Sequence, residues 1–232
     1  MPFILINKPK DWTSHDVVGY LRGILKIKKI GHAGTLDPFA TGLLIVGVER
    51  DATKQLDTFK NLPKTYIAKI KLGAITNTYD STGIITEKSS KKPKIKEIKE
   101  ILKQFIGPQE QIPPMHSAKK VAGKRLYKLA RKGIEIERKP NKIEIYNIKL
   151  LKYNYPHLTI EINCSTGTYI RSLANDIGQT LGIGAYCDEL QRTKIGEYTI
   201  EKSIDPKKID KNNYKDSASS KSIIYTRGNF SS

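Results

Sequence analysis

A glycine-rich stretch that runs into an apolar segment constrains this chain more than any other part of its sequence. Residues 31–42 read Gly-His-Ala-Gly-Thr-Leu-Asp-Pro-Phe-Ala-Thr-Gly, and the apolar run 43–48 follows directly. The glycines permit positive φ or a close backbone approach, and Pro38 biases Asp37 toward an extended conformation. The pattern predicts a loop of one definite shape that holds a single carboxylate against a buried strand.

Asp37 has two interpretations from the local sequence. A carboxylate fixed in this way suits chemistry on a substrate. Alternatively, Asp37 caps a short helix that has Pro38 at its first position, an arrangement that needs no substrate. The loop by itself leaves both interpretations open.

The net charge indicates the class of partner. Lys and Arg number 41 against 23 Asp and Glu, which gives a formal charge of +18 over 232 residues. Such a charge attracts polyanions at long range. We expect a nucleic acid as the partner, because a lysine-rich surface that serves only solubility is usually balanced by acids. A membrane surface is the weaker rival.

No apolar run approaches the ~20 residues that cross a bilayer, and the first apolar segment, Phe3 to Ile6, lacks the features of a signal peptide. A cytoplasmic protein is therefore expected. Cys164 and Cys187 form no C-x-x-C pair, and the four histidines show no ligand spacing. Free thiols and no metal are expected.

The hydrophobic periodicity predicts an α+β protein with a mixed, mainly antiparallel sheet, because strands and helices alternate without a βαβ rhythm. One main domain is expected over residues 1–204, and a polar, mobile tail over 205–232. Ser14 is expected to cap the first helix. Strands are predicted at about 3–7, 43–48, 64–72, 142–153 and 157–164, with a final strand pair over about 186–200, and helices at about 14–26, 94–106, 124–132 and 168–181.

Three further places concentrate reactive or stacking groups. Tyr66 lies on the inward face of its predicted strand, as a core aromatic or a cleft residue. Residues 167–171, Gly-Thr-Tyr-Ile-Arg, open a helix whose N–H groups and Arg171 could hold an anion, although a solvated surface arginine fits equally well. Arg192 reads as a site residue or as an edge-strand charge.

Taken in order, these motifs resemble the bacterial tRNA pseudouridine-55 synthase family (TruB-type), whose members isomerise one uridine in the T loop of tRNA. The resemblance runs from Leu5 to about Ser203. Residues 31–42 look like the catalytic loop of the family, and Lys64-Thr65-Tyr66 matches its K-x-Y strand. Residues 164–171, Cys-Ser-Thr-Gly-Thr-Tyr-Ile-Arg, match its second catalytic segment.

The resemblance implies a role for each central residue. Asp37 would be the essential acid, acting either covalently or electrostatically on the glycosidic bond. Arg171 would pair with Asp37 and keep it ionised. Tyr66 would stack on the extruded uracil, Tyr169 would sit beside the reacting ribose and base, and Leu190 would line the apolar wall.

The resemblance also implies how RNA is held. His32 would contact T-loop nucleotides that are displaced when the target uridine leaves the stack. No cofactor is implied, because the isomerisation needs neither redox chemistry nor energy input. Plausible phosphate contacts are Lys8, Lys64, Lys120, Lys124, Arg125 and Arg131.

The implied architecture is the pseudouridine-synthase fold, an α+β fold with a mainly antiparallel central sheet, flanking helices and a catalytic cleft. Two positions depart from the family pattern: Asn77 stands where Asp is frequent, and His116 where Tyr or Phe is common. Only 29 residues follow Ser203, so little or no C-terminal RNA-binding PUA domain is expected.

Two other functions remain open at this point. The chain could be a non-catalytic tRNA-folding chaperone that binds the T arm, which the high charge would also serve. It could instead act on another RNA or with a guide RNA, against which the short C-terminal part argues. For the leading hypothesis we expect a monomer that binds tRNA through its T arm.

Overall fold

The chain divides into two compact units. The computed structural model describes residues 2–117, 120–121, 123–130 and 133–217. The first unit is formed by Met1–Lys60 and Glu197–Ser232, and the second by Asn61–Gly196. The predicted domain over 1–204 includes parts of both units and stays a prediction. Both ends of the chain contribute to the first unit, so no break in composition along the sequence marks its boundary.

The first unit is built on strand β3 (Thr41–Val48), which pairs antiparallel with both β1 (Phe3–Lys8) and β2 (Ile30–Ala33). Helix α1 (Ser14–Leu25) packs its apolar stripe on these strands, and the short helices α2 (Glu49–Gln55) and α3 (Asp57–Lys60) follow β3. The buried core of this unit includes Ile4, Ile6, Val17, Val18, Leu21, Leu44 and Val46.

Helix α1 is capped one residue earlier than predicted. Thr13 is the N-cap: its Oγ1 accepts a hydrogen bond from the Asp16 N–H at 3.0 Å, and Asp16 Oδ2 accepts one from the Thr13 N–H at 2.8 Å. This reciprocal pair satisfies two N–H groups at the start of the helix. Ser14 has a different role, because it is buried inside the first turn and its hydroxyl bonds the backbone of Leu36.

The segment after Asp205 packs on the first unit as far as the structure describes it. Strand β13 (Tyr198–Thr199), the 3-10 turns η1 (Ile200–Lys202) and η2 (Pro206–Lys208), and helix α7 (Tyr214–Ser217) form the C-terminal part of this unit. Ile209 is only 3% exposed and Tyr214 9%, and both join the core beneath α1. The predicted mobile tail is thus wrong for residues up to 217. Residues 218–232 lie outside the described residues.

Truncated chains measure how much this packing contributes to the free energy of unfolding. A chain that stops after Asp205 loses Ile209 and Tyr214 from the core, and we expect its free energy of unfolding to fall by about 3 to 5 kcal/mol. A chain that stops after Ser217 keeps both side chains and serves as the matched control. Urea unfolding measures both; equal stabilities would show that the packing contributes nothing.

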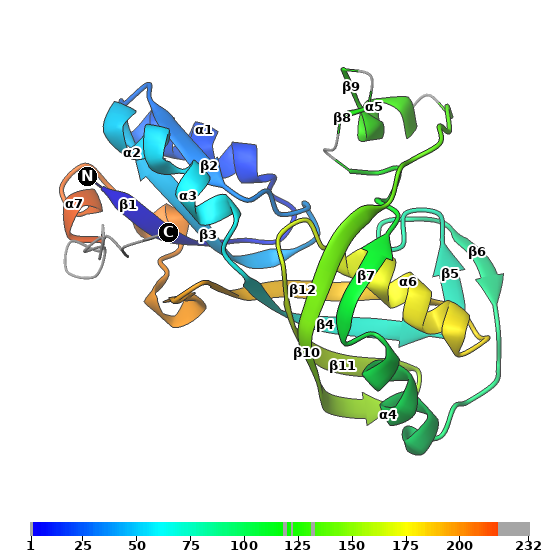
Figure 1. The fold of residues 1–232 in the computed structure, drawn as a ribbon. Helices are drawn as coiled ribbons and strands as arrows, with labels where there is room; N and C mark the ends of the chain where they lie inside the picture. Colours follow the sequence, from blue (N-terminus) through cyan, green and yellow to red (C-terminus); the bar gives the residue numbers. More distant parts are fainter. Residues whose placement is uncertain (1, 118–119, 122, 131–132, 218–232) are drawn as a thin grey trace, which may run out of the picture. The chain divides into compact units, whose positions relative to one another are not determined.

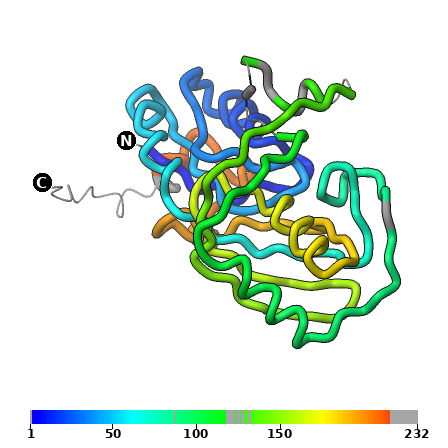
Figure 2. The backbone as a smooth tube through the Cα atoms, turned by 45° about the vertical axis from the view of Figure 1, so that its right-hand side comes forward, coloured from blue at the N-terminus to red at the C-terminus, as the bar shows by residue number. Residues whose placement is uncertain are grey.

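The second unit contains five strands that pair antiparallel in the order β12-β4-β11-β10-β7. Helices α4 (Ile95–Gln104) and α6 (Ile170–Thr180) lie against one face of this sheet in both views (Figures 1 and 2). The α+β class and the mainly antiparallel sheet are confirmed. The strands are β4 (Lys64–Leu72), β7 (Gly107–Gln111), β10 (Asn141–Asn154), β11 (His157–Cys164) and β12 (Ala185–Ile195).

Strand β7 was not expected from its sequence, Gly-Pro-Gln-Glu-Gln, which carries no apolar alternation. It pairs with β10 at the end of the sheet order, where a strand tolerates proline and polar side chains. The remaining elements extend beyond the sheet. They are the hairpin β5 (Ala74–Thr76) and β6 (Ile85–Lys88), the hairpin β8 (Lys120–Val121) and β9 (Lys124–Arg125), and helix α5 (Leu126–Ala130).

Candidate active site

Asp37 lies in a tight turn of the first unit. The N–H of Ala40 donates to the carbonyl of Asp37 at 3.1 Å, with Pro38 at the second position of the turn, where its fixed φ is favourable. No helix begins here, so the helix-cap interpretation is not observed. Gly34 and Gly42, at the two ends of the loop, have φ of 76° and 104°, values that side chains rarely adopt.

The turn is held on both sides of Asp37 by the segment that joins β1 to α1. The Leu36 N–H donates to Ser14 Oγ at 2.9 Å, and the Asp11 N–H donates to the Pro38 carbonyl at 2.8 Å. Leu36 itself is buried. The backbone on each side of the carboxylate is therefore fixed by contacts that do not involve the carboxylate.

Lys8 completes this support, which corrects one prediction. Its side chain is 0% exposed, and its ammonium donates to the carbonyls of Pro9 at 2.8 Å, Trp12 at 2.5 Å and Pro38 at 3.3 Å. A buried ammonium that is bound to backbone carbonyls is not a surface phosphate contact. Lys8 instead stabilises the turn that carries Asp37, through its hydrogen bond to the Pro38 carbonyl.

His32, the other predicted site residue of this unit, lies in β2 rather than in a loop. It stands opposite Val46 of β3 and is half-buried. Its predicted contact with T-loop nucleotides stays a prediction.

In the second unit, β4 and β12 place the predicted base-binding residues on one sheet face. Tyr66 stands opposite Arg192, and Ala68 stands opposite Leu190. Because alternate residues of a strand share a face, Tyr66 and Leu190 lie on the same side of the sheet. Leu190 is buried and Tyr66 half-buried. The arrangement offers an aromatic ring beside an aliphatic side chain.

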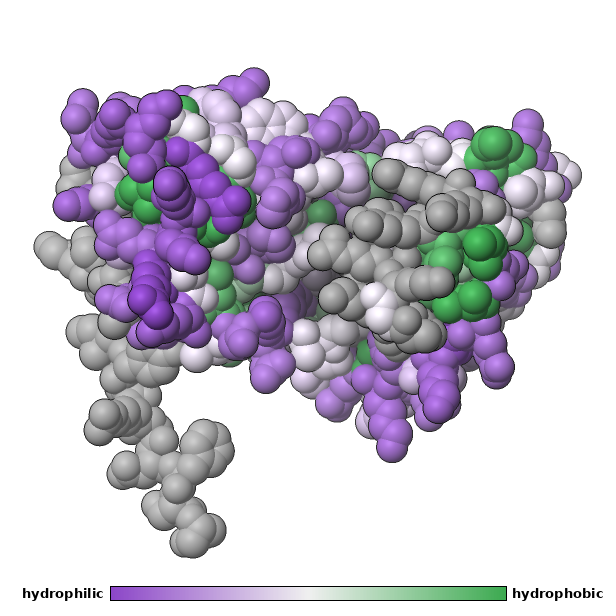
Figure 3. Space-filling view, turned by 90° about the horizontal axis from the view of Figure 1, so that it is seen from above, coloured by the Kyte–Doolittle hydropathy of each residue, from purple (hydrophilic) through white to green (hydrophobic). Residues whose placement is uncertain are grey.

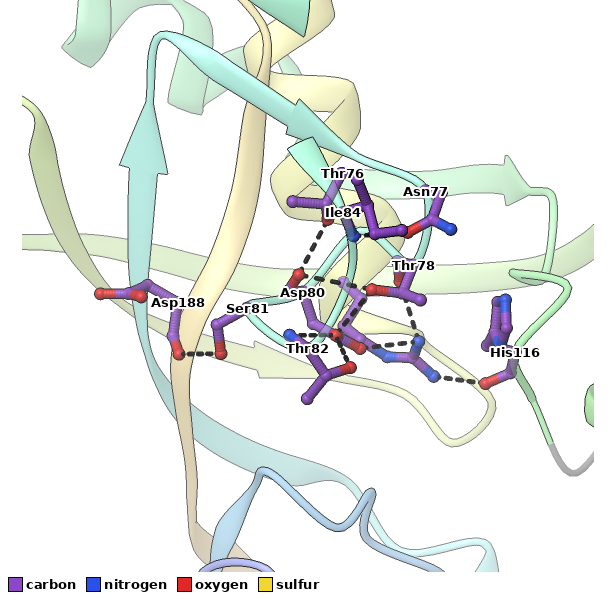
Figure 4. A network of polar contacts seen from close by, with 10 residues as sticks. Thr76, Asn77, Thr78, Asp80, Ser81, Thr82, Ile84, His116 and Asp188 are labelled. Carbon is purple, nitrogen blue, oxygen red and sulfur yellow. Dashed lines mark hydrogen bonds and ion pairs between the residues drawn. The ribbon is translucent and has the colours of Figure 1, made fainter. Parts of the chain in front are cut away.

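Arg171, in the first turn of α6, is buried and held in the β5–β6 hairpin connection. Its Nη1 donates to Asp80 Oδ2 at 3.1 Å and to the Thr78 carbonyl at 3.0 Å, and its Nη2 donates to the His116 carbonyl at 2.8 Å. Figure 4 shows Thr78, Asp80 and His116 converging on this guanidinium network. The alternative of a solvated surface arginine is wrong.

Asp80 is the site residue that the sequence interpretation missed. Its Oδ1 accepts from Thr78 Oγ1 at 2.8 Å and from the N–H and hydroxyl of Thr82 at 3.0 and 2.5 Å, which leaves Oδ2 for Arg171 (Figure 4). Asn77 closes the same loop by accepting from the Ile84 N–H at 2.9 Å. The signal in the sequence was local. An aspartate with one threonine two residues before it and another two residues after it is typical of a turn whose side chains hydrogen-bond within the turn.

The predicted site residues are thus distributed over both units. Asp37 and His32 belong to the first, and Tyr66, Tyr169, Arg171 and Leu190 belong to the second. Within the second unit Arg171 pairs with Asp80. The pairing of Arg171 with Asp37 stays a prediction.

Lys64 and Arg192 bring two cations into the interior of the second unit. Both side chains are buried, and burial together with the charge of Arg192 lowers the pKa of Lys64 to about 8. The predicted phosphate contact of Lys64 stays a prediction. The side chains of Lys120, Lys124 and Arg125, and residue Arg131, lie outside the described residues.

The low pKa of Lys64 gives a signature in stability against pH. The ordinary pKa of 10.5 holds in the unfolded chain, whereas the folded chain has a value of about 8. Between these values the unfolded state binds more protons, so the wild type should gain stability relative to Lys64→Met as pH rises from 8 to 10.5. Urea unfolding across that window measures the difference, with Lys142→Met as the exposed control. A constant difference would contradict the shift.

The formal charge of +18 suits a polyanionic partner. The face in Figure 3 is mostly hydrophilic outside the grey residues. Within the described ranges, no helix is long and apolar enough to cross a membrane. Cys164 and Cys187 are buried free thiols.

Comparison with known proteins decides the family. Residues 22–170 match the model of the TruB family pseudouridylate synthase N-terminal domain, and residues 171–225 match that of the tRNA pseudouridylate synthase B C-terminal domain. The chain belongs to the TruB family. The predicted family and enzyme class are confirmed. The second match includes the segment that packs on the first unit.

Individual members of the TruB family show the same relationship. The chain is 50% identical over 206 residues to tRNA pseudouridine synthase B of Protochlamydia amoebophila (strain UWE25), covering 89% of this chain and 78% of that protein. It is also 50% identical over 211 residues to the enzyme of that name from Clostridium tetani (strain Massachusetts / E88), covering 90% and 73%.

A solved structure of an H/ACA RNP bound to a substrate RNA containing 2′-deoxyuridine is 27% identical, with a TM-score of 0.66 over 88% of this chain. This chain spans about half, 50%, of the matched chain. The likeness confirms the predicted pseudouridine-synthase fold.

Proposed function

We propose that this chain isomerises uridine 55 in the T loop of tRNA to pseudouridine. Membership of the TruB family and the relatives named tRNA pseudouridine synthase B support the reaction and the substrate class. The observation that carries the proposal is the turn of Asp37, whose backbone is held from both sides by Lys8, Asp11 and Ser14. A backbone fixed in this way keeps the carboxylate in one place for chemistry on a bound base.

The reaction needs an extruded uridine. The bond from ribose C1′ to uracil N1 breaks, a bond from C1′ to C5 forms, the C5 proton leaves and N1 gains a proton. A base inside the T-loop stack cannot rotate, so it must leave the stack and enter a pocket. Tyr66 would stack on the uracil, and Leu190, on the same sheet face, would form an apolar wall beside it.

The charge of Arg171 is proposed to act on the acid. Arg171 would pair with Asp37 and keep the carboxylate ionised, while Asp80 holds the guanidinium in place within the second unit. Asp37 would then cleave the glycosidic bond, by covalent attack or by electrostatic assistance. Tyr169, one residue before α6 begins, would stand beside the ribose and base.

A tritium-release assay tests this function. An unmodified tRNA transcript labelled at uridine C5 loses its label when C5 bonds to the ribose, and we expect release of one label per tRNA. A transcript with cytidine in place of the target uridine is the control. No release from the first transcript would sink the proposal, and binding without release would favour the alternative of a tRNA-folding chaperone.

The T arm is proposed as the recognised part of the tRNA, and the protein is proposed to act as a cytoplasmic monomer. The formal charge of +18 supplies phosphate attraction to a folded RNA. A T-arm hairpin should compete with full tRNA in the assay, and sedimentation should give a mass near 26.1 kDa. Failure of the hairpin to compete would place recognition elsewhere on the tRNA.

A further inference from the structure

The side chain of Gln111 forms two hydrogen bonds with the backbone of a single residue, Tyr169. Gln111 Nε2 donates to the Tyr169 carbonyl at 3.1 Å, and the Tyr169 N–H donates to Gln111 Oε1 at 2.7 Å. The glutamine is 3% exposed and is the last residue of β7, so water competes little for these bonds. Two bonds to one residue fix both its position and its tilt.

These two hydrogen bonds hold the residue at which helix α6 starts. Tyr169 is the N-cap residue of α6, and no side chain of its own provides a capping hydrogen bond. Helix α1 shows the ordinary solution, in which Thr13 caps from within the chain segment itself. In α6 the partner of the N-cap backbone comes instead from a strand 58 residues earlier in the chain.

Two more contacts tie the same segment to the first turn of α6. Ser172 Oγ donates to the Ile112 carbonyl at 3.2 Å, and Arg171 Nη2 donates to the His116 carbonyl at 2.8 Å. The backbone of Gln111 is itself anchored, because it pairs with Asn141 in β10. The residues after β7 and the start of α6 are therefore joined at three points.

We propose that Gln111 is a positioning residue that sets the orientation of Tyr169 for the reaction. The inference rests on the proposed function, in which the Tyr169 ring stands beside the ribose and base. The positions of N, Cα and C set the direction of the Cα–Cβ bond, and φ and ψ determine which rotamers the side chain can adopt. By holding the two peptide groups of Tyr169, Gln111 restricts the orientations that the tyrosine ring can take.

Gln109 provides a matched control on the same strand. Its Nε2 donates to the Phe105 carbonyl at 2.6 Å, so Gln109→Leu also removes a hydrogen bond from a side chain to the backbone, but away from α6. We expect Gln111→Leu to lower the single-turnover rate of tritium release by about tenfold to a hundredfold at saturating enzyme. The Kd for tRNA should stay within about twofold, and Gln109→Leu should keep the wild-type rate.

The variant Gln111→Glu distinguishes an effect on the orientation of Tyr169 from an effect on the stability of the fold. Its ionised carboxylate still accepts from the Tyr169 N–H but repels the Tyr169 carbonyl, whereas the protonated carboxyl can donate to it. The release rate of this variant should therefore rise relative to wild type as pH falls, while its melting temperature stays above the assay temperature. A merely structural role would not produce this pH profile.

The outcomes distinguish this inference from the function on which it rests. If the wild type releases no label, the proposed function fails, and the positioning role fails with it. If the wild type is active and Gln111→Leu matches Gln109→Leu, only the positioning role is overturned. A loss confined to tRNA affinity, or a Gln111→Glu profile parallel to wild type, overturns it as well.

Discussion

Asp37→Asn is expected to reduce tritium release from labelled tRNA by at least about a thousandfold, because the amide can neither attack nor carry the charge that the reaction needs. The folded loop should survive the change. Its holding contacts involve the backbone of Leu36, Asp37 and Pro38, all of which asparagine retains. Affinity for tRNA should stay within about threefold, since one loop acid contributes little to phosphate binding.

The control for Asp37→Asn is the same substitution at a second aspartate of the first unit. Asp57 is an exposed residue of α3 that pairs with Lys60 on the surface, and Asp57→Asn should leave release and affinity unchanged. Single-turnover release and a filter-binding Kd, measured for both variants, complete the test. Asp37→Asn with wild-type release would remove Asp37 from the reaction, and a parallel loss of tRNA binding would reassign it to recognition.

Asp80→Asn is expected to lower the free energy of unfolding by about 1.5 to 3 kcal/mol, because it removes the charge from the carboxylate that accepts a hydrogen bond from the buried guanidinium of Arg171. Asparagine has nearly the same shape, so the effect reports charge rather than a cavity. We also expect slower tritium release, since Arg171 would lose the carboxylate that orients it.

A surface pair gives the reference value for this prediction. Asp188 lies 3.5 Å from Lys69, with both side chains partly exposed, and Asp188→Asn should cost less than about 1 kcal/mol. Urea unfolding of both variants measures the contrast. Equal costs would show that the Asp80 pair contributes no more than a surface contact.

Local periodicity was sufficient for the regular elements. The alternation over 64–72 predicted β4 with its observed ends, and the apolar stripe that begins at Val17 predicted α1. Strand β7 was not predicted, because an edge strand needs no apolar alternation. Its presence follows from pairing with β10, which a local pattern does not contain.

The misjudged side chains all have partners far away in the sequence. The local sequence indicates a solvated lysine at position 8, yet one of the carbonyls that accept hydrogen bonds from its ammonium belongs to Pro38. Asp80 meets Arg171 across 91 residues. Ile209 and Tyr214 are isolated apolar residues in a polar stretch, and only the tertiary fold shows that they complete a core. Long-range partners of this kind leave no periodic signal.

The pairing of Leu5 and Asn7 with Ile204, on the far side of the second unit in the sequence, determines when the first unit can fold on the ribosome. Ile204 donates its N–H to the Leu5 carbonyl and accepts from the Asn7 N–H, and Ile209 and Tyr214 then close the core. Domains fold during synthesis only when their residues have emerged. The unit that carries Asp37 therefore cannot complete its fold until residues that follow the whole second unit have been translated.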